Sequence, residues 1–266
     1  DSYTNQNVGL GEGFINMGQN RDTPFTLERA RFVENLGKIV SDLENINHGQ
    51  LFEAIHHAYE KTLGNNFGDK RLIFYHLHKY DPYSMANFLK YFPKTQLLTI
   101  IRNPLQSCES WVLNVAKTKQ ENKYKFYAII VSRIISMLVN LNCPAFLTQD
   151  CAAVRLEDLK TKPRETMRRL CIYLNIEHEV TLYQSTMQGM KWWGDELSKL
   201  GCNENDAGFS KAMVTNRWEK RLGYSDKYLL EFLLEEKLKY YEYPIHFHMG
   251  VVSYIVAFLL IPLPLS

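Results

Sequence analysis

The stretch from Leu97 to Trp111, LLTIIRNPLQSCESW, constrains the fold of this chain more than any other. It opens with a short run of apolar and β-branched residues, which is typical of a strand buried on both faces of a parallel sheet. Arg102 follows the run, and Asn103-Pro104 then turns the chain into a helix. The stretch therefore predicts an α/β fold in which a central strand ends at a charged side chain.

Arg102 and Ser110 are candidate ligands for a phosphate group. The carboxyl ends of parallel strands border the crevice where open α/β sheets bind ligands, and Ser110 follows Arg102 after eight residues, about two helical turns on. A guanidinium fork and a hydroxyl that face one crevice supply three hydrogen bonds to a phosphate. The alternative is a solvated charge at a strand end beside a serine on a helix surface, and spacing alone leaves both interpretations open.

The segment before this strand predicts a second strand that ends in a histidine. Lys70–Tyr75, KRLIFY, reads as a strand, and a helix from Pro82 to Phe92 leads into the central strand. Strand, helix and strand in this order form a βαβ unit, which would bring His76 and Arg102 to one crevice.

Two segments resemble the sulfotransferase family. The strand followed by R-N-P and by serine after eight residues resembles the 3′-phosphate-binding motif of enzymes that use 3′-phosphoadenosine 5′-phosphosulfate (PAPS). The 23 residues VRLEDLKTKPRETMRRLCIYLNI, from Val154 to Ile176, resemble a second family segment. The resemblance implies transfer of a sulfuryl group from PAPS to an acceptor hydroxyl or amine. It also implies that Arg102 and Ser110 bind the 3′-phosphate and that His76 is the catalytic base, a role that suits a neutral imidazole. The alternatives are a structural histidine at position 76, or His78 as the base.

The resemblance extends to two later segments. Ser185, Thr186 and Met187 fall where the family has a nucleotide-binding segment, so two hydroxyls and an apolar side chain are expected to contact the adenosine part. Arg217 opens RWEKRL, which is similar to an R-W-x-x-x-L signature of many family members, and its side chain is expected to reach the 3′-phosphate. The alternative for the second segment is a solvated basic helix start.

The sequence also departs from the family pattern. Phe74 and Leu156 stand where many members have a lysine and an adenine-contacting tyrosine. The family's first strand and its phosphosulfate-binding loop, P-x-S-G-T-T, have no counterpart in the sequence, so we expect a fragment of a longer enzyme. The implied fold is a P-loop-NTPase-like three-layer sandwich, a central parallel sheet flanked by helices, with the N-terminal strand and loop missing. We expect a sulfotransferase-like domain over 1–247 and a hydrophobic tail over 248–266.

Net charge and cysteine content limit the partners, metal sites and cellular compartment that we expect. A net charge of +2 does not call for a nucleic-acid partner. The family resemblance implies a small-molecule or carbohydrate acceptor. The five cysteines are odd in number and lack C-x-x-C spacing, which argues against a disulfide framework and a zinc ribbon. No third ligand is spaced to join His76 and His78, so no metal is expected. A reducing, cytoplasmic compartment is the simplest interpretation.

The uncharged C-terminal tail raises the question of contact with a membrane. Residues 249–265, MGVVSYIVAFLLIPLPL, carry no charge over 17 residues, which is the lower limit of about 17–25 residues for a membrane span. The run fits a membrane span, an interfacial segment or a helix that folds back onto the core.

Two other functions of the protein remain open: a P-loop kinase-like phosphotransferase, and a membrane-tethered binding module without catalysis.

Overall fold

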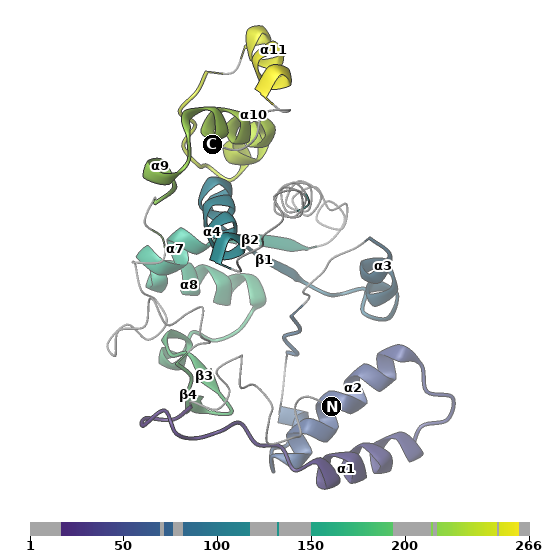
Figure 1. Ribbon diagram of the computed structural model, residues 1–266. Helices are drawn as coiled ribbons and strands as arrows, with labels where there is room; N and C mark the ends of the chain where they lie inside the picture. Colours follow the sequence, from purple (N-terminus) through teal and green to yellow (C-terminus); the bar gives the residue numbers. More distant parts are fainter. Residues whose placement is uncertain are drawn as a thin grey trace. The chain divides into compact units, whose positions relative to one another are not determined.

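The computed structural model describes residues 17–69, 72–76, 82–117, 132, 150–193, 214, 217–248 and 250–260. The chain forms two compact units, each built from two stretches of sequence (Figure 1). The first unit consists of Asp1–Thr95 and Ile176–Ser210, and the second of Gln96–Asn175 and Lys211–Ser266.

The first unit contains a pair of packed helices, α1 (Arg29–Ser41) and α2 (His48–Thr62). A capping box starts α2, because the Asn47 side chain accepts a hydrogen bond from the Gln50 backbone and the Gln50 side chain accepts one in return. The two helices are joined through a buried hydrogen bond of 3.1 Å, in which Asn35 Nδ2 donates to Thr62 Oγ1. Small side chains such as Ala58, which is fully buried, allow the two backbones to approach.

The segment before α3 (Pro82–Tyr91) corrects a prediction. A 3₁₀ turn, η2 (Phe67–Asp69), precedes it, but the described residues Leu72–His76 form neither strand nor helix, so a strand over Lys70–Tyr75 is wrong for this part. Strand structure needs a hydrogen-bonded neighbour, and this segment has none among the described residues. The side chains of 72–76 are instead exposed, with the Tyr75 ring stacked on Phe88 at 6.1 Å between centroids.

A short hairpin completes the first unit. After the 3₁₀ turn η3 (Val180–Tyr183), β3 (Thr186–Met187) pairs antiparallel with β4 (Met190–Lys191). Gln188 and Gly189 between the strands have φ values of 51° and 74°, as the two central residues of a type I′ turn require. The hairpin is fastened to residue 17, because Met17 forms β-bridges to both Thr23 and Trp192.

The second unit contains the predicted central strand, helix and strand. β1 (Leu97–Ile101) leads into α4 (Pro104–Lys117), and β1 pairs in parallel with β2 (Cys151–Arg155), with Leu97 opposite Cys151. β2 continues into α7 (Leu156–Thr161) and α8 (Pro163–Leu174). These elements confirm the predicted central strand and the predicted helix after R-N-P. Among the described residues, the parallel neighbour of β1 is thus β2 and not the segment 72–75.

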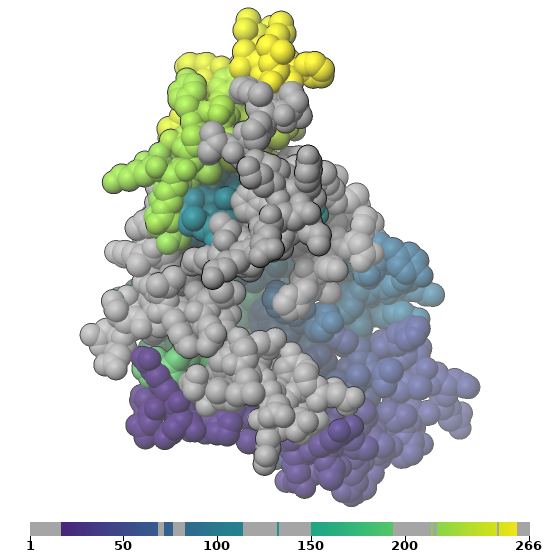
Figure 2. Space-filling view, viewed as in Figure 1, coloured from purple at the N-terminus to yellow at the C-terminus, as the bar shows by residue number. Residues whose placement is uncertain are grey.

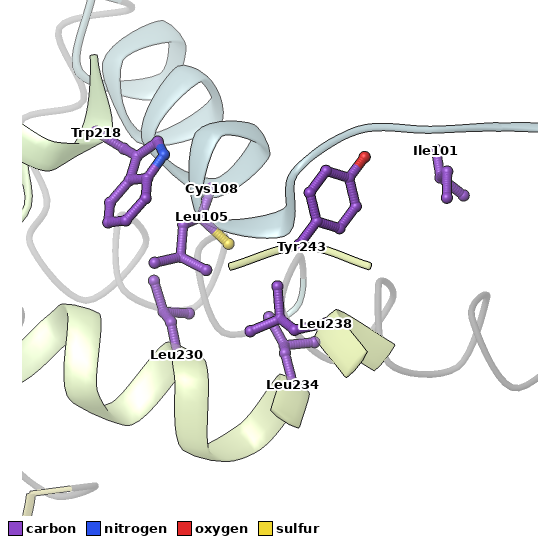
Figure 3. Close-up of a cluster of buried hydrophobic side chains, with 8 residues drawn as sticks. All are labelled: Ile101, Leu105, Cys108, Trp218, Leu230, Leu234, Leu238 and Tyr243. Carbon is purple, nitrogen blue, oxygen red and sulfur yellow. The ribbon is translucent and has the colours of Figure 1, made fainter. Parts of the chain in front are cut away.

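The core of the second unit joins α4 to α9 (Trp218–Arg221) and α10 (Tyr224–Tyr240), and α11 (Val251–Leu260) packs on α10. On α10, three leucines that are four residues apart point to one side and meet Leu105 and Cys108 of α4 (Figure 3). The buried cluster consists of Ile101, Leu105, Cys108, Trp218, Leu230, Leu234, Leu238 and Tyr243. The molecule is therefore a mixed α/β protein with a small parallel sheet.

Candidate functional site

The turn between β1 and α4 is held by hydrogen bonds on both sides of Asn103. Its side-chain Oδ1 accepts from the backbone N–H groups of Leu105 at 2.9 Å and Gln106 at 3.3 Å, which caps the first turn of α4. Its own backbone N–H donates to Glu157 Oε1 at 2.9 Å. Pro104 occupies the first position of the helix, where a missing N–H costs nothing. The turn thereby fixes the arginine that precedes it.

Arg102 and Ser110 come together as their spacing predicts. Arg102 Nη1 donates to Ser110 Oγ at 3.4 Å, from the end of β1 to the second turn of α4. Burial lowers the pKa of the half-buried Arg102 guanidinium, and the positive charge of Arg217 lowers this pKa further, while Glu157 and Glu109 act in the opposite direction. Arg217 therefore lies within electrostatic range of Arg102. The site holds two guanidinium groups and one hydroxyl.

Behind this group lies a buried polar cluster on α4. Glu109 is 2% exposed and Gln106 is 1% exposed. Glu109 accepts hydrogen bonds from Arg221 Nη1 at 2.6 Å, Gln106 Nε2 at 2.6 Å and Ser110 Oγ at 3.3 Å. Gln106 Oε1 in turn accepts from the backbone N–H of Arg217 at 2.9 Å. The cluster therefore ties both ends of α9 to α4 and places Arg217 beside the site.

Glu157 supports the site from the opposite side. Its Oε1 receives the Asn103 N–H, and its Oε2 accepts a hydrogen bond of 2.8 Å from the hydroxyl of Tyr243. Burial raises the pKa of Tyr243, and the Glu157 charge raises it further, so the phenol stays a proton donor. Arg155 lies 5.5 Å from the Tyr243 ring centroid and pairs with Asp158 at 2.7 Å. The segment after β2 thus holds the β1–α4 turn in place.

His76 and the predicted adenosine-binding residues lie in the first unit. His76 is exposed and follows a segment without strand structure, and His78 lies outside the described residues. Ser185 is half-buried and its carbonyl accepts from the Trp192 N–H at 2.8 Å, while Thr186 and Met187 form β3. The approach of His76 and Arg102 to one crevice stays a prediction.

Sequence reasoning missed most of the polar residues that hold the site in place: Gln106, Glu109, Glu157, Arg221 and Tyr243. One signal was available, because Gln106 and Ser110 are four residues apart on one helix face with Glu109 beside them. Among the described residues, no group of three His, Cys, Asp or Glu side chains is arranged to hold a metal ion.

Comparison with known proteins identifies the family. The model of the sulfotransferase family matches residues 22–180, which is more than half of the 266 residues. This chain therefore belongs to the sulfotransferase family, whose members are transferases. The matched range contains β1, the R-N-P turn, α4, β2 and α8, and it contains His76, Arg102 and Ser110.

One similar solved structure is the sulfotransferase domain from the curacin biosynthetic pathway. It is 16% identical to this chain, with a TM-score of 0.40, and the alignment covers 90% of this chain and 82% of that one. No curated protein matches the sequence.

Proposed function

We propose that this protein transfers a sulfuryl group from PAPS to the hydroxyl or amine of a small-molecule or carbohydrate acceptor. The observation that supports this proposal is the group formed by Arg102, Ser110 and Arg217 at the carboxyl end of β1. Burial and a neighbouring cation both disfavour the charge on Arg102. A phosphate dianion beside the two guanidinium groups would offset both effects. The 3′-phosphate of PAPS is such an anion.

The proposed roles follow the chemistry of each side chain. Arg102 and Arg217 donate charge-assisted hydrogen bonds to the 3′-phosphate, and Ser110 adds a neutral one. Ser185 and Thr186 provide hydroxyls for the nucleoside, and Met187 provides an apolar surface for adenine. His76 accepts the acceptor's proton as the new bond from oxygen or nitrogen to sulfur forms. The bond from sulfur to the 5′-phosphate oxygen breaks, and its electron pair stays on that phosphate.

We also propose the complete fold of the protein and the cellular compartment in which it acts. The parallel pair β1–β2 is consistent with a central parallel sheet in a P-loop-NTPase-like three-layer sandwich. Cys108, Cys151 and Cys171 are free thiols, which supports a reducing, cytoplasmic compartment.

The nucleotide itself provides the test. Calorimetry compares adenosine 3′,5′-bisphosphate with adenosine 5′-monophosphate, which lacks only the 3′-phosphate. We expect the bisphosphate to bind more tightly to the unmodified chain. Arg102→Ala should weaken bisphosphate binding by about 10- to 100-fold, the size of a lost charge-assisted hydrogen bond, and should leave monophosphate binding nearly unchanged.

Arg168→Ala is the matched control, because Arg168 is an exposed arginine on α8 of the same unit. This variant should bind both nucleotides as the unmodified chain does. Equal affinity of the unmodified chain for the two nucleotides, or equal losses in the two arginine variants, would remove the 3′-phosphate assignment. Discrimination without sulfuryl transfer would instead support a binding module without catalysis.

A further inference from the structure

The C-terminal helix α11 packs on α10 through its small side chains. Ser253 and Ala257 are buried, at 4% and 1% exposure. The Ser253 hydroxyl also accepts a hydrogen bond of 2.9 Å from the Gly250 N–H, which caps the start of the helix. The Tyr254 ring meets Phe232 of α10 edge-on, with 5.1 Å between the centroids.

The large side chains of α11 point outward. In Figure 2 the atoms of α11, in yellow, stand out beyond the green atoms of α10. Six large side chains are exposed to between 62% and 85% of their surface: Val251, Val252, Tyr254, Ile255, Phe258 and Leu259. This distribution is the reverse of that in an ordinary surface helix, which turns its large apolar residues toward the core. Small residues at the helix contact and large apolar residues outside are typical of helices in lipid.

We propose that this outer face of α11 inserts into the interfacial region of a phospholipid bilayer. Protein interfaces carry a polar rim and about one hydrogen bond per 100–200 Å². The outer face of α11 offers a single polar group, the Tyr254 hydroxyl, and no charged residue occurs from 249 to 266. A neutral surface with so few hydrogen-bonding groups complements hydrocarbon better than it complements a protein.

The dimensions of α11 indicate how it lies. Its ten residues make a helix about 15 Å long, half of the roughly 30 Å hydrocarbon thickness, so the proposal places it along the interface rather than across the bilayer. Among the basic residues near the end of α10, Lys239 pairs with Glu235 at 2.5 Å and the Lys237 ammonium lies 6.0 Å from the Tyr240 ring centroid, while α11 itself carries no charge. Binding should therefore depend on apolar insertion and not on anionic lipid.

None of the helices in the described part of the chain combines the length and the apolar character that crossing a membrane requires.

Flotation of the full chain with phosphatidylcholine vesicles tests this proposal. We expect the protein to float with the vesicles, and we expect no loss of binding when salt rises from about 0.1 to 0.5 M, since screening acts only on charges. Ile255→Glu should lower the bound fraction at least tenfold. The matched control is Ile172→Glu, the same substitution on α8 of the same unit, where the isoleucine is 72% exposed against 62% for Ile255.

Both positions are exposed, so both variants should keep the circular dichroism spectrum of the unmodified chain. Light scattering of the three proteins separates lipid binding from self-association. The proposal fails if the unmodified chain stays at the bottom of the gradient, or if the two glutamate variants float equally. It also fails if Ile255→Glu converts an oligomer into a monomer while flotation is unaffected, because the face would then join copies of the chain.

Discussion

Arg102 occupies a position in which its own charge is costly, since it is half-buried and a second guanidinium, Arg217, lies nearby. Glu157 and Glu109 compensate in part, but each carboxylate already accepts other hydrogen bonds, from Asn103 and Tyr243 and from Gln106 and Arg221. Ionisable groups with perturbed pKa values are common at sites where a protein binds a ligand or catalyses a reaction. This arrangement is consistent with the proposed binding of a phosphate group beside Arg102 and Arg217.

At the scale of residues, the sequence predicted that Arg102 and Ser110 lie close together, but not the buried residues that hold them in place. The eight-residue spacing between a strand end and a helix was enough for this prediction, because local strand and helix geometry fixes the distance. Glu109 was not predicted, because a carboxylate normally stays in water. Its burial depends on Arg221, which is 112 residues away in sequence and reaches it only through the tertiary fold.

His76 is the residue whose role most needs a kinetic test. His76→Ala should lower turnover about 10²- to 10⁴-fold, since the acceptor would lose its general base, with little change in affinity for adenosine 3′,5′-bisphosphate. The measurement is release of the bisphosphate from PAPS in the presence of p-nitrophenol or glucosamine as acceptor probes. His78→Ala is the control, and a loss confined to that variant would assign the base to His78 instead.

At the scale of elements, a strand formed where an apolar segment pairs with a neighbouring strand, and the strand prediction was wrong where the segment has no such pairing. Leu97–Ile101 and Cys151–Arg155 are short apolar strands, and they pair in register along five residues. The segment Leu72–Tyr75 has a similar composition but no paired neighbour among the described residues. Composition indicates that a segment is suited to a strand, whereas pairing depends on the rest of the sheet.

The contact between α4 and α9 yields a prediction about stability. Glu109→Gln keeps the shape of the side chain but loses the charge that faces Arg221, and it places an amide donor among existing donors. Arg221 is 48% exposed and can be hydrated, so the cost should be smaller than for a fully buried pair, about 1–3 kcal/mol of unfolding free energy. Urea unfolding measures this loss, and bisphosphate affinity should fall with it because Ser110 and Arg217 lose their fixed positions.

The control for this change is Glu165→Gln on α8. Glu165 pairs with Arg169 at 3.1 Å, but both side chains are largely exposed, so this variant should stay within about 0.5 kcal/mol of the unmodified chain. Equal stability losses in the two glutamine variants would show that the burial of Glu109 contributes nothing specific to the α4–α9 contact.

At the scale of the whole molecule, the chain passes between two compact units three times. The second unit has a contiguous core around α4 and α10. The first is held by the α1–α2 pair, by ring contacts of Phe52 with Phe88 and Phe92, and by the β3–β4 hairpin. The sequence predicted the helix that begins at Pro82 and the helix after R-N-P, but it did not predict this division into two units, because contacts between distant segments decide the division.

Two units with separate cores predict unfolding that is not a single transition. Leu234→Ala should lower the stability of the second unit by about 2–5 kcal/mol, since Leu234 is 1% exposed and lies in the middle of the core cluster. Hydrogen exchange should then accelerate in β1, α4 and α10 but not in α1 and α2. Leu113→Ala, at a 36% exposed position on α4, controls for the substitution and should change exchange little. Equal acceleration in both units would show that they unfold as one cooperative structure, because exchange through global unfolding reports the same free energy at every protected amide.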